Sequence, residues 1–157
     1  MKHFILSLAV VLSCTACASQ QNAFKSFADH FGKTAAFAYA NVGGRDVLLV
    51  SHEVFGDDEA EGLQAIAASI FALDSDGKIV TLGSIRSQGT LYPISVADNK
   101  LLVAGHTFVN IFDIRGEEPE LVMADYEDSD YDSPQLKALF KTFEDATPVI
   151  FKKKRSK

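Results

Sequence analysis

Tight-turn signals between short apolar segments are the feature that most constrains how this chain of 157 residues can fold. Gly43-Gly44, Asp76-Gly77 and Asp98-Asn99 each separate two apolar segments. These residue types tolerate the positive φ angles of two-residue hairpin turns, so the pairs predict antiparallel β-hairpins. The strands expected on this basis are 35–42, 47–55, 66–73, 78–85, 91–97, 100–105, 108–114 and 120–126, with 147–151 as a further candidate.

An amphipathic helix is predicted before the sheet, over residues 21–33. Four apolar residues fall at the helical spacing i, i+3, i+4 and i+7, namely Phe24, Phe27, Ala28 and Phe31. The strand that follows has small residues along one face, namely Ala36, Ala38 and Ala40. Because bulky side chains pack well on a shallow partner, we expect the helix to lie on this alanine face.

A second helix is predicted over residues 134–146. Ser133 is a suitable N-cap and Pro134 suits the first helical position. The apolar stripe of this helix consists of Leu136, Leu139, Phe140 and Phe143. The expected fold class is therefore α+β, an antiparallel β-meander of about seven or eight strands with one helix at each end.

Residues 1–18 have the three parts of a bacterial export signal. Lys2 supplies a positive start, residues 4–12 are apolar, and small residues follow over 13–18. A membrane-spanning helix needs about 20 consecutive apolar residues, and this run is much shorter. We therefore expect a signal over 1–18, one β-rich domain over 19–151 and a basic tail over 152–157, located in the bacterial cell envelope, the periplasm or outside the cell.

The sequence leaves three positions open for the first residue of the mature chain. Val11-Leu12-Ser13-Cys14 resembles the lipobox of bacterial lipoproteins, in which an apolar and a small residue precede the lipidated cysteine. Cys17 follows a second match, in which Cys14 replaces the usual Leu or Val. The resemblance implies a membrane anchor through acyl chains at Cys14 or Cys17. Ala16-Cys17-Ala18 instead suits a peptidase that cuts before Ser19 and leaves neither cysteine.

Cys14 and Cys17 also spell C-x-x-C, which is typical of redox and zinc sites. Such a role needs a neighbouring βα unit or a second pair of ligands, whereas these cysteines lie inside the signal. We therefore expect no redox or metal site here, no cofactor, and a domain that folds without disulfides.

The charge of the chain bears on its partners. With 21 acidic against 15 basic residues the net charge is −6, which repels phosphate backbones and disfavours nucleic-acid binding. Acidic residues gather in two segments, 57–61 and 125–132. The alternation over 128–132 resembles calcium ligation, but Ser133 and Leu139 stand where an EF-hand requires Gly and Glu. We interpret the segment as a solvated loop before a helix.

His52 and His106 are the candidates for an acid–base pair or a metal site. Each shares a predicted strand face with apolar residues, so both are expected to face an apolar layer. Glu53 alternates to the opposite face from His52, and no H-x-H or H-E-x-x-H spacing is present. Half-buried histidines that are hydrogen-bonded to neighbours are the simpler interpretation, and no metal is expected.

No nucleophile, phosphate-binding or dinucleotide motif occurs in the sequence. We therefore expect a non-enzymatic binding or interaction module of the envelope, whose partner is a protein or an envelope polymer. Sheet edges and exposed loops are the binding candidates. The candidate residues are Asp57, Asp58, Glu59, Glu61, Arg86, Asp128, Asp130 and Asp132. Two alternatives stay open: an exported metal-dependent hydrolase that uses His52 and His106, and an inhibitor or immunity-type protein for another envelope protein.

Overall fold

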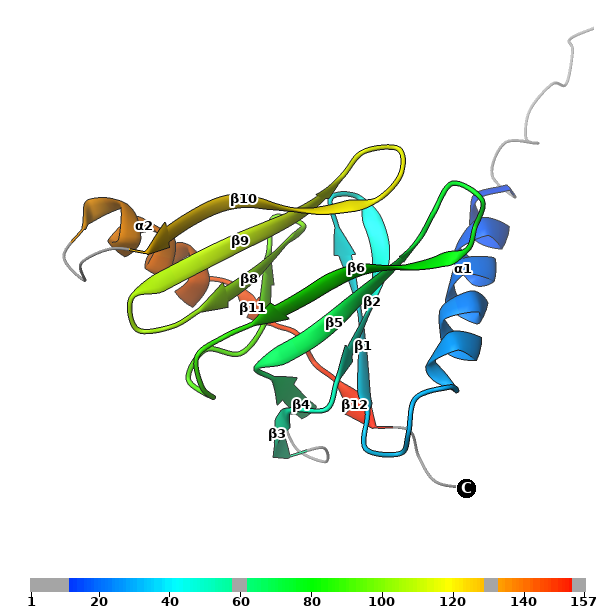
Figure 1. Ribbon diagram of the computed structural model, residues 1–157, viewed down its shortest axis with the longest axis horizontal. Coiled ribbons are helices and arrows are strands. Elements are labelled where there is room, and N and C mark those ends of the chain that lie inside the picture. Colours follow the sequence, from blue (N-terminus) through cyan, green and yellow to red (C-terminus); the bar gives the residue numbers. More distant parts are fainter. Residues whose placement is uncertain (1–11, 58–61, 129–132, 154–157) are drawn as a thin grey trace, which may run out of the picture.

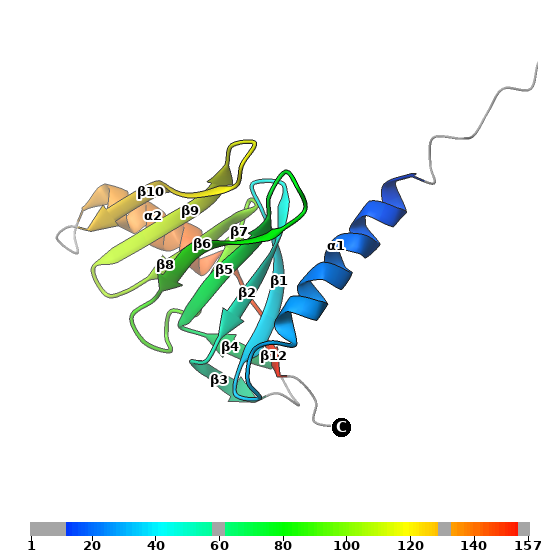
Figure 2. The ribbon, with the colours of Figure 1, turned by 45° about the vertical axis from the view of Figure 1, so that its right-hand side comes forward.

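The computed structural model describes residues 12–57, 62–128 and 133–153, and for 12–19 and 126–128 the backbone alone. Two five-stranded antiparallel sheets pack against each other, and one helix covers the outer face of each (Figure 1). The turned view in Figure 2 shows the long helix α1, Leu12–Ala28, beside the first sheet. The layers therefore run helix, sheet, sheet, helix.

The first sheet has the strand order β12-β1-β2-β5-β6. Its strands are β1 Ala36–Val42, β2 Arg45–Ser51, β5 Ala67–Leu73, β6 Ile79–Arg86 and β12 Lys152–Lys153. The β1–β2 hairpin is confirmed, and its two turn residues, Gly43 and Gly44, have φ angles of 60° and 79°. The β5–β6 hairpin is confirmed as well, with Gly77 at a φ of 76°.

The second sheet has the strand order β10-β9-β8-β7-β11. Its strands are β7 Ser95–Ala97, β8 Lys100–Ala104, β9 Phe108–Arg115, β10 Glu120–Asp128 and β11 Thr147–Pro148. Asp98 and Asn99 form the predicted turn between β7 and β8, with φ angles of 47° and 55°. Strand β7 is shorter than the predicted 91–97, because a turn precedes it in which the Tyr92 N–H donates to the Gly89 carbonyl at 3.1 Å.

The prediction of one continuous meander is wrong, although α+β is confirmed as the fold class. The described residues form twelve strands in three sheets, the third being a small hairpin of β3, Val54–Asp57, and β4, Gly62–Ala65. This hairpin interrupts the predicted strand 47–55. The Glu53 N–H donates to the Ser51 Oγ at 3.0 Å, and this local bond bends the chain between β2 and β3.

Apolar side chains on both faces of the central strands explain the division into two sheets. In β2, Val47 and Leu49 point into the core between the sheets, whereas Leu48 and Val50 point to the outer core beneath α1. In β8, Leu101 and Leu102 divide in the same way between the inner core and the core beneath the second helix. Because both faces are apolar, each sheet needs a covering layer on either side.

Helix α1 packs on the face of β1 opposite to the one predicted. Phe24, only 1% exposed, contacts Tyr39, and the centroids of the two rings are 6.2 Å apart. Ala36 and Ala38 instead belong to the core between the sheets. The physical reason is that small side chains are needed most where two backbone layers approach each other, whereas the Phe-rich helix finds partners among other aromatic rings.

Helix α2, Pro134–Glu144, confirms the second predicted helix. The Ser133 Oγ accepts a hydrogen bond from the Leu136 N–H at 3.1 Å, and Pro134 lies in the first turn. Leu136, Leu139 and Phe143 are buried against the second sheet. Each large apolar side chain buried in this way contributes about 1.5–3 kcal/mol.

The segment after α2 joins the two sheets. Of the predicted strand 147–151, only Thr147–Pro148 forms a strand, β11, which pairs with β7. Strand β12, which pairs with β1, follows it and consists of the first two residues of the predicted basic tail. Between the two strands the Phe151 N–H donates to the Leu63 carbonyl at 2.7 Å, and the Phe151 side chain is fully buried. The segment 147–153 thus contacts the second sheet, the small hairpin and the first sheet.

Candidate functional site

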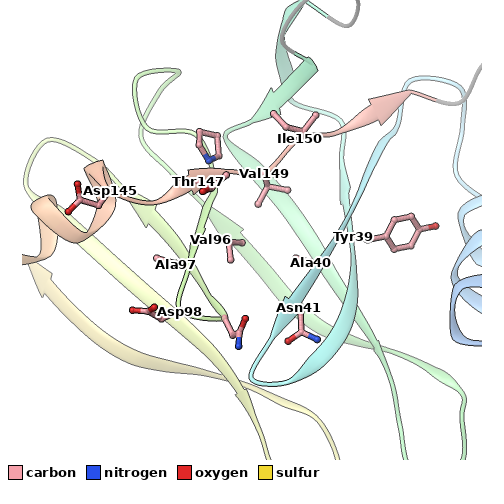
Figure 3. A pocket seen from close by; sticks show the side chains of 12 residues that line it. Tyr39, Ala40, Asn41, Val96, Ala97, Asp98, Asp145, Thr147, Val149 and Ile150 are labelled. Atoms are coloured by element: carbon pink, nitrogen blue, oxygen red, sulfur yellow. The ribbon is translucent and has the colours of Figure 1, made fainter. Parts of the chain in front are cut away.

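A large hollow in the described surface lies between β1 of the first sheet and β7 of the second. It has a volume of about 820 Å³. Figure 3 shows Tyr39, Ala40 and Asn41 on one side, Val96 and Ala97 on the other, and the segment that carries Thr147, Val149 and Ile150 running across. We call this hollow the β1 groove.

The β1 edge is the first distinctive feature of the groove. Strand β12 pairs with β1 only at Ala36 and Phe37, so the rest of this edge has no strand partner among the described residues. Val42 and Arg45 flank the two-residue turn and exchange hydrogen bonds, and alternate residues of β1 follow the same pattern. The backbone N–H and C=O groups of Tyr39 and Asn41 therefore point away from β2, along the open edge.

One end of the β1 groove is closed by a direct contact between the sheets. The Gly43 N–H donates to the Asn99 carbonyl at 2.8 Å, which joins the β1–β2 turn to the β7–β8 turn. A Cβ atom on Gly43 would lie 2.2 Å from the Ile114 carbonyl oxygen, so only glycine permits this approach. These two joined turns thus fix the distance between the two sheets at this end of the groove.

The floor and rim of the groove differ in chemistry. Ala40, Val96 and Val149 provide an apolar floor that belongs to the core between the sheets. Asp98 and Asp145 lie at the rim and are exposed, and none of the described lining residues is a lysine or an arginine. The groove therefore offers backbone hydrogen bonds, an apolar surface and a negative rim.

Tyr39 stands at the boundary between the groove and α1. Its side chain is 54% exposed, and in Figure 3 the ring points towards the helix. Partial burial raises the pKa of the Tyr39 phenol above its usual 10.0, because the charged form loses hydration. Asn41 is the other residue whose backbone N–H and C=O point away from β2, and its side-chain Nδ2 donates to the Asp46 Oδ1 at 3.0 Å.

Arg86, predicted as a binding residue, is already paired. Its guanidinium forms a two-pronged ion pair with Glu53, in which Nη1 and the Glu53 Oε2 are 2.8 Å apart. Hydrogen bonding to Arg86 lowers the pKa of the Glu53 carboxyl, and the same bond raises the pKa of Arg86. The pair joins the residue directly before β3 to the end of β6.

His52 and His106 do not face an apolar layer, contrary to the prediction. Both are exposed, because His52 follows the end of β2 and His106 lies in the turn between β8 and β9. The His52 Nδ1 lies 3.4 Å from the Thr34 Oγ1, and the His106 Nδ1 lies 3.2 Å from the Tyr92 hydroxyl. The two histidines thus have different partners.

The acidic candidates are only partly described. Asp57 is an exposed residue at the end of β3 and has an interaction partner of its own. Asp128 ends β10, and its side chain is outside the described part. Asp58, Glu59, Glu61, Asp130 and Asp132 lie outside the described residues. Within the described residues, no three His, Cys, Asp or Glu side chains are grouped so that they could hold a metal ion.

The lipidation candidates lie in α1, where the structure gives the backbone alone for Cys14 and Cys17. The first eleven residues and the end of the basic tail, 154–157, are outside the described part. Among the described helices, none has the length and apolar character needed to cross a membrane.

Comparison with protein-family models, curated proteins and solved structures finds no match for this chain. The β1 groove itself was not predicted from the sequence. Asp98-Asn99 was recognised as a turn and 147–151 as a strand, but nothing local indicates that both lie beside β1. Their convergence depends on the pairing of β11 with β7 and of β12 with β1.

Proposed function

We propose that this chain is a non-enzymatic binding module that takes an extended peptide segment of a partner protein along the open edge of β1. The observation that carries the proposal is the unpaired edge at Tyr39 and Asn41, which faces the β1 groove. A peptide strand added there would satisfy the outward backbone groups with main-chain hydrogen bonds, as in other cases of strand addition to a sheet edge.

The side chains of the groove define the kind of peptide. Ala40, Val96 and Val149 suit a small or branched apolar residue. Asp98 and Asp145 suit a basic residue nearby, since the described lining residues include no cation that would neutralise them. The preferred segment is therefore extended, apolar and positively charged.

The expected location of the module is the cell envelope, as the signal-like features of residues 1–18 indicate. A lipid at Cys14 or Cys17 would hold it at the membrane, whereas cleavage before Ser19 would release it. The β1 groove is lined by residues from Tyr39 onwards, so binding does not depend on which of these occurs. Mass spectrometry of the mature N-terminus distinguishes the three positions.

The alternatives have less support. A hydrolase built on His52 and His106 would need the two histidines to act on one substrate, but they bond to Thr34 and Tyr92 respectively. An inhibitor or immunity-type protein is a special case of the binding module, in which one stoichiometric partner occupies the β1 groove. Isolation of such a partner, with contacts mapped to Tyr39 and Asn41, supports this case.

The decisive variant is Asn41→Pro. Proline removes the outward N–H at this position but leaves the hydrogen bonds to β2 intact, because position 41 donates away from β2. The matched control is Asn41→Ala, which loses the side-chain bond to Asp46 but keeps the backbone N–H. We expect Asn41→Pro to abolish binding of a short synthetic peptide of valine and lysine, while Asn41→Ala retains it.

Binding is measured by nuclear magnetic resonance, with amide shifts at Ala40 and Ala97 as the readout, because both Asn41 variants retain these two N–H groups. A peptide of valine and glutamate tests the negative rim and is expected to bind more weakly. Equal binding by the two Asn41 variants would contradict the proposal. So would self-association of the chain through β1 that excludes the peptide, since the occupant would then be a second copy.

A further inference from the structure

A second hollow, with a volume of about 290 Å³, lies between the end of α1, strand β1 and the segment that ends in β12. Its apolar surface comes from Ala28, Phe37 and Ile150. Its lining also includes three exposed lysines, Lys25, Lys152 and Lys153. We call it the lysine pocket.

The three lysines come from two distant parts of the chain. Lys25 lies in the last turns of α1, and Lys152 and Lys153 form β12. The pairing of Lys152 with Phe37 and of Lys153 with Ala36 fixes the backbone that carries both lysines beside β1. Because Lys25 is far from Lys152 and Lys153 in the sequence, only the fold brings the three lysines together.

Lysines outnumber carboxylates among the described residues that line the lysine pocket. The salt bridges within the described residues involve none of Lys25, Lys152 and Lys153. Among these described lining residues Asp29 is the carboxylate, and it has an interaction partner of its own. The described lining thus holds three lysines and one aspartate, a local excess of positive charge, although the chain as a whole carries a net charge of −6.

An apolar surface beside an excess of positive charge matches a specific ligand chemistry. We infer that the lysine pocket binds an anionic amphiphile, a free single alkyl chain with a carboxylate head group. The chain would cover Phe37 and Ile150, where each buried CH₂ is favourable, and the carboxylate would accept hydrogen bonds from the lysine ammonium groups. The Tyr39 hydroxyl, also in the lining, is a further donor, since a phenol is protonated near neutral pH.

The lysine pocket does not depend on how residues 1–18 are processed. The most N-terminal residue in its lining is Lys25, which follows all three candidate cleavage positions. It is also separate in chemistry from the β1 groove, whose rim is negative and whose proposed ligand is a basic peptide. Failure of one proposal therefore leaves the other standing.

The test uses the full chain and decanoate below the concentration at which it forms micelles. Decanol serves as the uncharged probe and decyltrimethylammonium as the cationic one. We expect saturable binding of decanoate by calorimetry, with resonance shifts at Ala28 and Phe37, which line the lysine pocket and are not in the lining of the β1 groove. Decanol should bind more weakly and the cationic probe most weakly, and added salt should weaken the decanoate complex through screening.

The variant for the test is Lys152→Gln with Lys153→Gln. Its matched control is Lys78→Gln with Lys141→Gln, which removes the same charge at exposed positions outside the pocket lining. Loss of two exposed ion pairs should reduce decanoate affinity roughly two- to twenty-five-fold, while the control retains it. A third variant, Ile150→Ala, should lower affinity for decanoate and decanol alike.

Several outcomes would overturn the inference. Equal affinity for decanoate and decyltrimethylammonium would show that the lysines do not select charge. Shifts that map away from Ala28 and Phe37 would place the ligand elsewhere. Binding to anionic vesicles without binding to monomeric decanoate would show that the lysines recognise a membrane surface instead of a free amphiphile.

Discussion

The amide of Gly43 donates to the carbonyl of Asn99 across 2.8 Å, and this bond joins the two sheets at their turns. The neighbouring turns reinforce it. The Arg45 guanidinium donates to the Glu117 carbonyl at 2.8 Å and also to the Gly116 carbonyl, which ties β2 to the β9–β10 turn. Ser75, in the β5–β6 turn, donates to the Glu118 carboxylate in the same β9–β10 turn. Hydrogen bonds between these turns therefore crosslink one end of the two packed sheets.

Gly43→Ala should destabilise this end strongly. At a φ of 60°, an alanine Cβ would lie 2.2 Å from the Ile114 carbonyl oxygen, so the two sheets would have to separate. We expect the free energy of unfolding to fall by about 2–4 kcal/mol, measured by urea titration. Gly44→Ala is the control, because its φ is 79° but nothing lies within 4 Å of the added Cβ. Equal losses of unfolding free energy in Gly43→Ala and Gly44→Ala would show that backbone strain alone is responsible.

Glu53→Gln should remove a contribution to stability that depends on pH. The folded-state pKa of Glu53 lies below its ordinary 4.5, so the ion pair with Arg86 stabilises the fold fully above that pH. The contribution is lost as the pH falls through the depressed pKa and the carboxylate is protonated. The difference in melting temperature between wild type and Glu53→Gln should therefore be constant near neutrality and shrink in acid. A difference that grows in acid would contradict the assignment.

Ser133→Ala should destabilise α2 by about 1 kcal/mol, because it removes the acceptor for the Leu136 N–H. Ser133→Asp keeps an acceptor at the N-cap and should retain most of the stability. The measurement is equilibrium unfolding followed by circular dichroism. If both substitutions lower the free energy of unfolding by the same amount, the cap does not act through this hydrogen bond.

Phe151→Ala should be the most damaging of these substitutions. The side chain is fully buried in the core between the sheets, and such truncations cost about 3–5 kcal/mol. Its neighbour Ile150 is 41% exposed, so Ile150→Ala should cost much less. Chemical denaturation of the two variants tests whether the core includes this segment, and similar losses would argue against it.

Features that depend on neighbouring residues could be predicted from the sequence. Gly43-Gly44, Asp98-Asn99 and the cap at Ser133 all behave as predicted, because turn and cap geometry is set within a few residues. The alternation of Phe37 with Ala36 and Ala38 was also recognised. The choice of which face meets α1 was not, because a strand with two apolar faces does not reveal which of two layers will cover each.

Features that depend on distant pairing could not be predicted. The β1 groove needs β1, β7 and the segment after α2 to meet, and the lysine pocket needs α1 beside β12. The pairing of Arg86 with Glu53 has the same origin, since it spans the inserted hairpin of β3 and β4. Arg86 looked like a free surface cation, and only the arrangement of the strands shows that its charge is already engaged.

The pairing of β12 with β1 has a consequence for the order of folding. Strand β1 leaves the ribosome early, but β12, its partner at Ala36 and Phe37, is translated after every other strand of the sheet. Phe151 joins the core between the sheets equally late. During synthesis the nascent chain therefore lacks both this partner strand and one of its largest core side chains. The first sheet and the core between the sheets can be completed only after residues 151–153 have been synthesised.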